Sequence, residues 1–342
     1  MKVSTEFITP GQVLAEDIYS GSNWLLPRGI IINHKIIDRL KKWGVQEIAI
    51  EATDVDQQFN KCYEDAKNVL DNLFYDVQNN RAININPVAN TIKNMADMIF
   101  NNNNVLKSFE HIRHREKYTF IHSVDVAVLA ILIGCQRGYS RRTLYELGTG
   151  AALHDIGKVR IPVEILNKKN KLDEQEFIEV QKHTIYGHEL LQSSLGVSYN
   201  ISCIALMHHE RLDGKGYPFN LHKGTLPEFV RITSVADVYS ALTLNRPYRK
   251  RMTPSEAIEV LWGIAGKQID LDILRLLFRS CSIYPVGCKI RLNDGRIGEV
   301  MQANPEVPTR PIIKLDGGLN TSSQVIDLNK QLSVVIEDLV IS

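Results

Sequence analysis

The sequence has no long apolar run and few cysteines. Across 342 residues no stretch approaches the ~20 apolar residues of a membrane-spanning helix, so no membrane span is expected. The opening residues, MKVSTEFITP, lack the apolar core of a secretory signal, which predicts a cytoplasmic protein. The five cysteines are scattered, odd in number and without a Cys-x-x-Cys pair, which argues against a disulfide framework and a zinc ribbon.

The sequence also lacks an excess of one charge. It has 40 Lys and Arg against 39 Asp and Glu, a formal net charge of +1, so nothing at this level predicts DNA binding. Hydrophobic residues make up 44% and charged residues 23%, as in ordinary globular proteins. Because single cores usually stop growing near about 250 residues, this chain is expected to form more than one domain.

Changes in sequence pattern divide the chain into four expected parts. Residues 1–55 alternate strand patterns with one helix, which predicts a small α/β domain with a regulatory or interface role. Residues 56–104 have helical periodicity and predict a connector, whose long helices could form a homodimer although they show no clean heptad. Residues 105–280 predict an all-helical bundle. Residues 281–342, with a turn at Asp294-Gly295, predict a small β extension. The expected fold class is therefore mainly α.

The chemically distinctive residues lie inside the expected bundle. His154-Asp155 comes shortly before Lys158, and His208-His209-Glu210 comes shortly before a glycine-rich turn. Asp173 and Glu176 form a capping signal for a helix that is expected to continue to His183. Hydrophobic periodicity puts a metal-competent side chain on the inward face of each of five predicted helices. These five are His122, His154, His183, His208 and Asp237, and the adjacent Asp155 and His209 bring the candidate ligands to seven.

These seven residues have a structural and a functional interpretation. Any one buried His or Asp is most often a hydrogen-bonded core residue. Burying several imidazoles and two carboxylates together would cost several kcal/mol each unless they were paired or bound to cations. Neighbouring helix residues point about 100° apart, so an adjacent pair can share one site only at a helix end. Mixed imidazole and carboxylate ligands suit iron, manganese, nickel, cobalt or zinc better than magnesium or calcium, and the ligand types alone do not choose among these five.

The chain resembles the HD-GYP branch of the HD phosphohydrolase superfamily over roughly residues 105–280. The matching residues, in order, are His154-Asp155-x-Gly157-Lys158, His183, His208-His209-Glu210-x-x-Asp213-Gly214-x-Gly216-Tyr217-Pro218, Asp237 and Arg246-Pro247-Tyr248-Arg249. The resemblance implies an HD-type helical bundle that hydrolyses cyclic di-GMP to linear pGpG, with a further cut to GMP left open. Some relatives hold a third ion through a glutamate where this chain has Tyr118, so two ions are expected here.

The resemblance also implies roles for the metal ligands. One ion would be held by His122, His154, Asp155 and Asp237, and the other by Asp155, His183, His208 and His209. Asp155 would then bridge two divalent transition-metal ions. A hydroxide activated by both ions would attack phosphorus in line, while the ions neutralise the developing charge.

Three basic residues are expected at the substrate phosphates. Lys158 lies close to the His-Asp pair and is expected to take part in catalysis by contacting a phosphate directly. Arg246 and Arg249 are expected on the second phosphate or its ribose, because guanidinium matches phosphate oxygens. Neighbouring Lys250 and Arg251 are expected to be solvated.

The Gly216-Tyr217-Pro218 segment predicts a turn, with glycine supplying conformational freedom and proline a fixed φ. The resemblance ties this turn to substrate contact through Tyr217 and to partner proteins of the diguanylate cyclase type.

Three functional interpretations remain open at this point. The first is a cyclic di-GMP phosphodiesterase. The second is a phosphohydrolase of another cyclic dinucleotide or nucleotide, because the sequence does not reveal the base pocket. The third is a catalytically weak, metal-containing module for signalling or partner binding.

Overall fold

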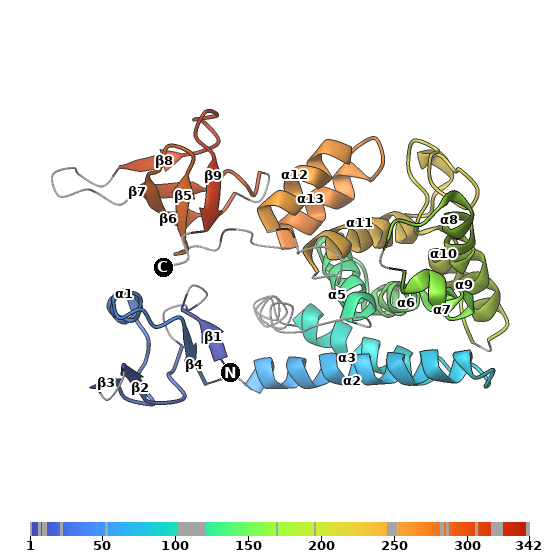
Figure 1. Cartoon of the computed structure of the whole chain (residues 1–342), viewed down its shortest axis with the longest axis horizontal. Coiled ribbons are helices and arrows are strands. Elements are labelled where there is room, and N and C mark those ends of the chain that lie inside the picture. The colour runs from blue at the N-terminus through green and yellow to red at the C-terminus, as the bar shows by residue number, and fades with distance from the viewer. Residues whose placement is uncertain are drawn as a thin grey trace. The chain divides into compact units, whose positions relative to one another are not determined.

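The computed structural model separates into two compact units. One comprises Met1–Gln57 with Ser282–Ser342, and the other comprises Gln58–Cys281. The residues that the structure describes are 2–5, 8, 12–20, 23–51, 54–101, 121–168, 170–194, 196–244, 252, 254–280, 284, 287–304, 307–315 and 324–339. Figure 1 shows these residues as helices and strands.

The N-terminal segment forms small strand pairs and one helix. Strand β1 (Lys2–Ser4) pairs antiparallel with β4 (Glu47–Ala49), and β2 (Ile18–Ser20) pairs antiparallel with β3 (Asn23–Leu26). Helix α1 (His34–Lys42) begins after Asn33, whose side chain accepts the N–H of Ile36, and its apolar face is buried in a local core.

The C-terminal segment is a five-stranded antiparallel sheet with the strand order β8-β7-β6-β5-β9. Its strands are β5 (Lys289–Leu292), β6 (Ile297–Gln302), β7 (Ile312–Leu315), β8 (Val325–Asp327) and β9 (Ile336–Leu339). Ile290 and Leu292 are buried while Arg291 between them is exposed, which is the two-residue period of a half-buried strand. Gly295, with φ of 80°, closes the expected hairpin.

The larger unit is helical. Its longer elements are α2 (Asp54–Gln78), α3 (Asn86–Asn101), α5 (Ile121–Gln136), α6 (Arg141–Ala152), α9 (His183–Gln192), α10 (Tyr199–Met207), α11 (Glu228–Thr243), α12 (Pro254–Ile264) and α13 (Leu271–Ser280). The short elements are η1 (Ile156–Arg160), α7 (Val163–Leu166), α8 (Glu174–Gln181) and η2 (Lys223–Thr225). The expected mainly α fold, with small α/β and β attachments, is confirmed.

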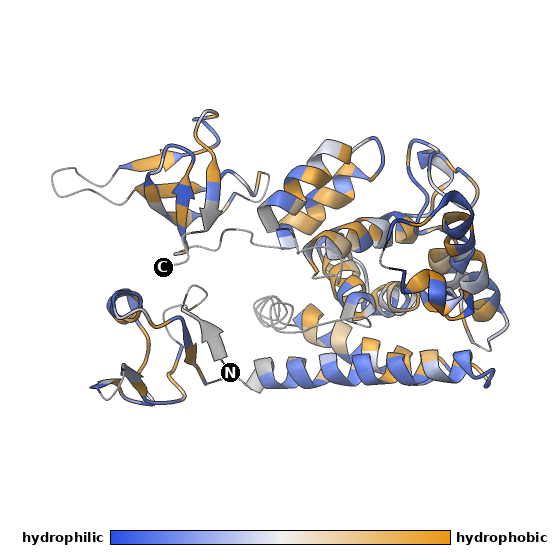
Figure 2. Ribbon diagram, in the orientation of Figure 1, coloured by the Kyte–Doolittle hydropathy of each residue, from blue (hydrophilic) through white to orange (hydrophobic). Residues whose placement is uncertain are grey.

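Helix α5 is the centre of this bundle. Residues 123–134 are all buried, and α5 packs against α6, α11 and α13. A helix that is apolar on every side must be enclosed by other elements. In Figure 2, by contrast, α2 presents mostly hydrophilic residues along its outer side. Within the described part of the chain, no helix is both long enough and apolar enough to cross a bilayer.

One helix boundary differs from the sequence expectation. Asp173 and Glu176 form the expected capping box, but the helix that they open, α8, ends at Gln181. Lys182 separates α8 from α9, so His183 begins a new helix instead of continuing the first. Phe177, on α8, is 47% exposed. His183, the first residue of α9, is fully buried.

Glycine allows η1 and α9 to approach each other closely. A Cβ atom on Gly157 would lie 1.9 Å from the carbonyl oxygen of His183 and 2.4 Å from the backbone nitrogen of Gly187. No side chain fits in this space. The contact sets the distance between the His154-Asp155 segment and the helix that begins with His183.

We expect Gly157→Ala to lower the free energy of unfolding by about 1–3 kcal/mol or more, because the added methyl group would force η1 away from α9. Chemical denaturation measures this change. The matched control is Gly263→Ala in α12, where an added Cβ meets nothing within 4 Å. The control should leave stability unchanged or raise it by up to about 1 kcal/mol. Equal effects of the two substitutions would contradict the close-approach explanation.

Candidate metal centre

Segments far apart in sequence bring the seven selected side chains together at helix ends and inward faces. His154 follows Leu153, the C-cap of α6, and Asp155 is the N-cap of η1. His208 is the C-cap of α10, and His209 follows it. The remaining three lie within helices: His122 in α5, His183 at the start of α9 and Asp237 in α11. His154-Asp155 and His208-His209 therefore both lie at helix ends.

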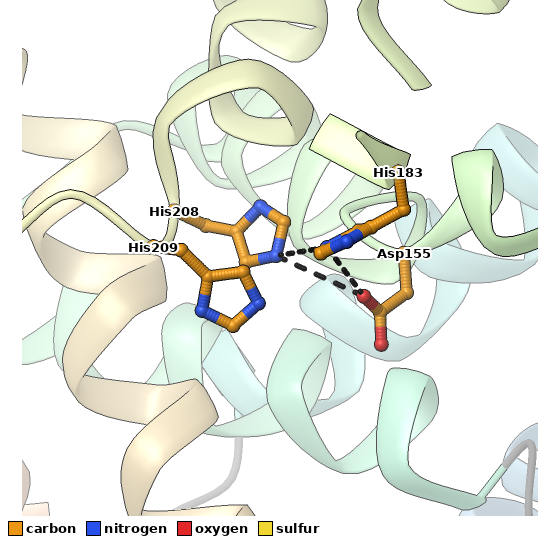
Figure 3. A group of neighbouring side chains, drawn as sticks. All are labelled: Asp155, His183, His208 and His209. Carbon is orange, nitrogen blue, oxygen red and sulfur yellow. Dashed lines mark hydrogen bonds and ion pairs between the residues drawn. The ribbon is translucent and has the colours of Figure 1, made fainter. Parts of the chain in front are cut away.

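The first group of ligand-competent residues contains Asp155, His183, His208 and His209, with one donor atom of each within 4.8 Å of all the others. Figure 3 shows the Asp155 carboxylate and the His183 and His208 rings directed at a common space. Asp155 Oδ1 lies 3.4 Å from His183 Nε2 and 3.8 Å from His208 Nε2. The His183 and His208 Nε2 atoms are 3.4 Å apart.

The second group contains His122, His154 and Asp237, again within 4.8 Å of one another. His122 Nε2 lies 3.0 Å from Asp237 Oδ1. The two groups adjoin, because His154 Nε2 lies 3.3 Å from Asp155 Oδ2 and His209 Nδ1 lies 4.0 Å from Asp237 Oδ2. Asp155 therefore borders both groups of side chains.

Backbone carbonyls determine which imidazole nitrogen faces the cluster. The Nδ1 atoms of three histidines lie at carbonyl oxygens: His154 at Ala151 (2.7 Å), His183 at Val180 (2.6 Å) and His208 at Ala205 (3.0 Å). A carbonyl oxygen only accepts hydrogen bonds, so each Nδ1 carries the proton. In the neutral ring, Nε2 then offers its lone pair to the cluster, which is the usual arrangement of a metal-ligating histidine.

Two polar atoms in this cluster are buried without a hydrogen bond to any described residue. His154 is 0% and Asp155 is 6% exposed, and His154 Nε2 and Asp155 Oδ1 find no hydrogen-bond partner within the described part of the chain. An unsatisfied buried polar atom costs about 1–3 kcal/mol, and more when the group is charged. A cation between these atoms would remove that cost. The residues present therefore fit metal ions, and the cluster of His and Asp side chains is able to bind them.

The electrostatics favour the ligating form of most of these groups. Burial raises the pKa of Asp155, but Lys158 and His154 outweigh it and lower the pKa well below the usual value. Burial likewise opposes ionisation of Asp237, whereas its hydrogen bond to His122 lowers its pKa well below the usual value. Burial lowers the pKa of His183 to about 4 and that of His209 to about 3, so both rings are neutral at neutral pH.

His154 differs from the other buried histidines. Burial lowers its pKa, but the adjacent Asp155 carboxylate raises it, and the net pKa is above the usual value. The cause is the anion 3.3 Å from its Nε2, a position where a metal ion would compete for the same carboxylate.

Of the three basic residues expected at the substrate phosphates, only Lys158 lies within the described residues. Lys158 Nζ lies 2.5 Å from Asp155 Oδ2, beside the cluster. A cavity of about 450 Å³ is lined by cluster residues together with Lys158, Arg211 and Tyr217. The Tyr217 ring is centred 4.7 Å from that of His209. Arg246 and Arg249 lie outside the described residues, as does Tyr118.

Sequence reasoning missed two residues of the site. The Ser240 hydroxyl lies 3.0 Å from His122 Nδ1, three residues after Asp237 on α11, and helical spacing would have identified it. Arg211 lines the cavity and donates from Nη1 to Ser234 Oγ at 2.7 Å. Its position directly after the His-His-Glu sequence was the available signal. His188, which was not expected to be a ligand, lies at the carbonyl of Ser202 and outside both groups.

Family models agree with this geometry. A model described as "HD domain" matches residues 93–273. The chain belongs to the HD domain family. A second model, described as "KOW domain associated with HD domain", matches residues 289–341. The histidine and aspartate cluster thus lies inside the HD domain, and the five-stranded sheet lies inside the KOW match.

The HD domain has curated relatives. The chain is 32% identical to the cyclic di-GMP phosphodiesterase PA4108 of Pseudomonas aeruginosa over 269 residues, 78% of this chain and 65% of the relative. It is 31% identical to the cyclic di-GMP phosphodiesterase PdeB of Borreliella burgdorferi, covering 67% of this chain and 59% of the relative. It is 32% identical to the 3′3′-cGAMP-specific phosphodiesterase 2 of Vibrio cholerae, covering 57% and 36%. The chain spans less than two thirds of the length of each.

A solved structure shares the fold. Bd1817, an HDG"Y"P protein from Bdellovibrio bacteriovorus, superposes with a TM-score of 0.56 over 81% of this chain and 97% of that chain, at 16% sequence identity. At this identity the likeness concerns the fold alone.

We expect the purified protein to bind transition-metal ions, and its thermal stability to rise as the concentration of free metal rises above the Kd. A ligand at 100 times its Kd stabilises the folded state by about 2.7 kcal/mol. Elemental analysis and thermal unfolding of chelated and reloaded samples measure both effects. Asp155→Asn should lower the bound metal and abolish most of the gain. His188→Asn, on the same helix as His183 but outside the cluster, should change neither. Metal binding that survives Asp155→Asn unchanged would argue against this site.

Proposed function

We propose that this chain is a metal-dependent phosphodiesterase that hydrolyses cyclic di-GMP to linear pGpG. The observation that carries the proposal is the seven-residue His and Asp cluster beside Lys158, inside an HD domain whose curated relatives include cyclic di-GMP phosphodiesterases. The 450 Å³ cavity at this cluster supports it, because its size is within the range of small-molecule sites. Whether pGpG is cut further to GMP is part of the test below.

The proposed cofactors are two divalent transition-metal ions, with iron, manganese or nickel favoured over cobalt or zinc. One ion would be held by His122, His154, Asp155 and Asp237, and the other by Asp155, His183, His208 and His209. When bound, they would supply Lewis-acid charge at the phosphate and acidify the attacking water. The buried carboxylates, ionised at neutral pH, would hold the ions, and the Nδ1 hydrogen bonds would keep the imidazoles oriented.

The remaining roles fall to residues around the cluster. The Lys158 ammonium group, already beside Asp155, would bind a phosphate oxygen at the reacting centre. Arg246 and Arg249 would bind the second phosphate or its ribose, an assignment that rests on the sequence. Tyr217 would contact the substrate through its ring. Burial and the two cluster carboxylates raise its pKa, so its phenol keeps its proton.

A second candidate substrate is 3′3′-cGAMP. The supporting observation is the 32% identity to a Vibrio cholerae phosphodiesterase specific for that molecule. The two cyclic dinucleotides share the phosphodiester bonds on which the cluster would act, and they differ in one base. The chemistry proposed here is therefore the same for both.

Several features of the cellular setting stay predictions from the sequence. These are a cytoplasmic location, a diguanylate cyclase-type partner at the Gly216-Tyr217-Pro218 turn, and self-association through residues 56–104.

Metal-loaded protein is expected to convert cyclic di-GMP to pGpG in a panel that also contains 3′3′-cGAMP, cyclic di-AMP and pGpG, with products separated by chromatography. Asp155→Ala should lower kcat by about 10³-fold or more, because it removes the carboxylate that borders both ligand groups. The control is Asp272→Ala, whose side chain is 81% exposed on α13. Cleavage of 3′3′-cGAMP alone would favour the second candidate. No cleavage of any cyclic dinucleotide would contradict the proposed function.

Arg246→Ala and Arg249→Ala are each expected to raise KM for cyclic di-GMP by about tenfold or more, because hydrogen bonds to charged groups contribute about 1.5–3 kcal/mol. Steady-state kinetics measure the effect. Arg251→Ala is the matched control from the same basic run and should change KM by less than about threefold. A larger effect of Arg251→Ala than of either other substitution would overturn this assignment.

A further inference from the structure

Glu210 is a buried carboxylate that takes part in neither ligand group. It is 2% exposed, and its two oxygens accept backbone N–H groups from across the following loop. Oε1 accepts the N–H of Phe219 at 2.7 Å, and Oε2 accepts that of Leu221 at 2.9 Å. Burying a carboxylate is costly, and two charge-assisted hydrogen bonds offset that cost. Glu210 thus links the end of the His208-His209 segment to the far side of the loop.

The same loop packs tightly against its own beginning. A Cβ atom on Gly216 would lie 2.3 Å from the Arg211 backbone nitrogen, 2.4 Å from Glu210 Cα and 2.5 Å from the His209 carbonyl oxygen. The Tyr217 N–H donates to that His209 carbonyl at 3.3 Å. Backbone contact with no intervening side chain therefore places Tyr217 directly over the segment that carries the two histidines.

Tyr217 separates two adjoining cavities. The cavity at the His and Asp cluster and a second cavity of about 450 Å³ share Tyr217, His209 and Arg211 in their linings. The rings of Tyr217 and His209 are 4.7 Å apart with an interplanar angle of 30°. Phe177 packs edge-on against Tyr217 from the second cavity, at 6.2 Å between ring centres. The position of Tyr217 therefore determines the shape of both cavities.

We propose that Glu210 is a positioning residue, which holds the loop of residues 216–221 so that the Tyr217 ring forms the wall beside His209 against which the substrate binds. The linings described for the two cavities do not include Glu210, so it acts through the loop and not by touching the ligand. The kinetic part of this inference rests on the proposed function. The structural part, that Glu210 orders the loop, does not.

Hydrogen exchange tests the structural part without any turnover. In Glu210→Gln, the side-chain amide keeps one carbonyl oxygen and presents N–H groups where the second acceptor stood, so one backbone N–H loses its partner. Exchange of the peptide containing Phe219 and Leu221 should become about tenfold faster or more, and faster still in Glu210→Ala. Exchange in α5 should stay the same, and so should bound metal. Glu174→Gln, at an exposed position on α8, is the matched control.

The kinetic part is tested with the same variants. Glu210→Gln should raise KM for cyclic di-GMP about tenfold while kcat changes less than about threefold, because the His and Asp cluster keeps its metal. A purely structural role in stability would lower the amount of folded enzyme and leave KM unchanged.

Gly216→Ala gives a second way to move the loop if Glu210 variants fold poorly. Its added methyl group would meet backbone atoms of His209, Glu210 and Arg211, while the Glu210 carboxylate would still be present. It should reproduce the faster loop exchange and the raised KM.

Unchanged loop exchange in Glu210→Gln and Glu210→Ala, or faster exchange throughout the domain, would overturn the inference. So would a loss of bound metal in Glu210→Gln, because Glu210 would then act on the cluster itself. If wild-type protein cleaves no cyclic dinucleotide, the proposed function fails, and the exchange result still decides whether Glu210 orders the loop.

Discussion

The burial of His154 Nε2 and Asp155 Oδ1 without hydrogen-bond partners among the described residues is the constraint on which the rest of this structure depends. Enclosing such atoms in a helical core is costly, and cations bound between them would remove that cost. The fold meets the geometric side of this requirement by ending helices at the cluster. The Nδ1 atoms of His154 and His183 donate hydrogen bonds to carbonyls of the preceding turn, so each Nε2 is free to bind a metal ion.

Glycine and one buried carboxylate bring the remaining parts into contact. Gly157 lets the backbone of η1 touch that of α9, which a side chain would prevent. Gly216 allows the loop backbone to contact the backbone at His209, and Glu210 accepts hydrogen bonds from the loop N–H groups of Phe219 and Leu221. The His and Asp cluster and the neighbouring loop are thus parts of one packing arrangement. A change in either would alter the shape of the cavity that Lys158 and Tyr217 line.

Much of this arrangement could be predicted from the sequence, for physical reasons. Apolar periodicity identified the helices, the Asp294-Gly295 turn identified the C-terminal hairpin, and the concentration of imidazoles and carboxylates on inward faces selected the seven cluster residues. The break at Lys182 could not be foreseen, because the apolar periodicity of the sequence continues through it. Arg211 contacts Ser234 on α11, and Glu210 accepts a hydrogen bond from Phe219 in the folded loop; neither contact can be read from local sequence.

The most direct test of the account is anomalous X-ray diffraction from crystals of metal-loaded protein, recorded at the absorption edge of the metal supplied. We expect two peaks inside the cluster, one beside the His122–His154–Asp237 group and one beside the His183–His208–His209 group. Full loading of the protein with no anomalous density inside this cluster would contradict it.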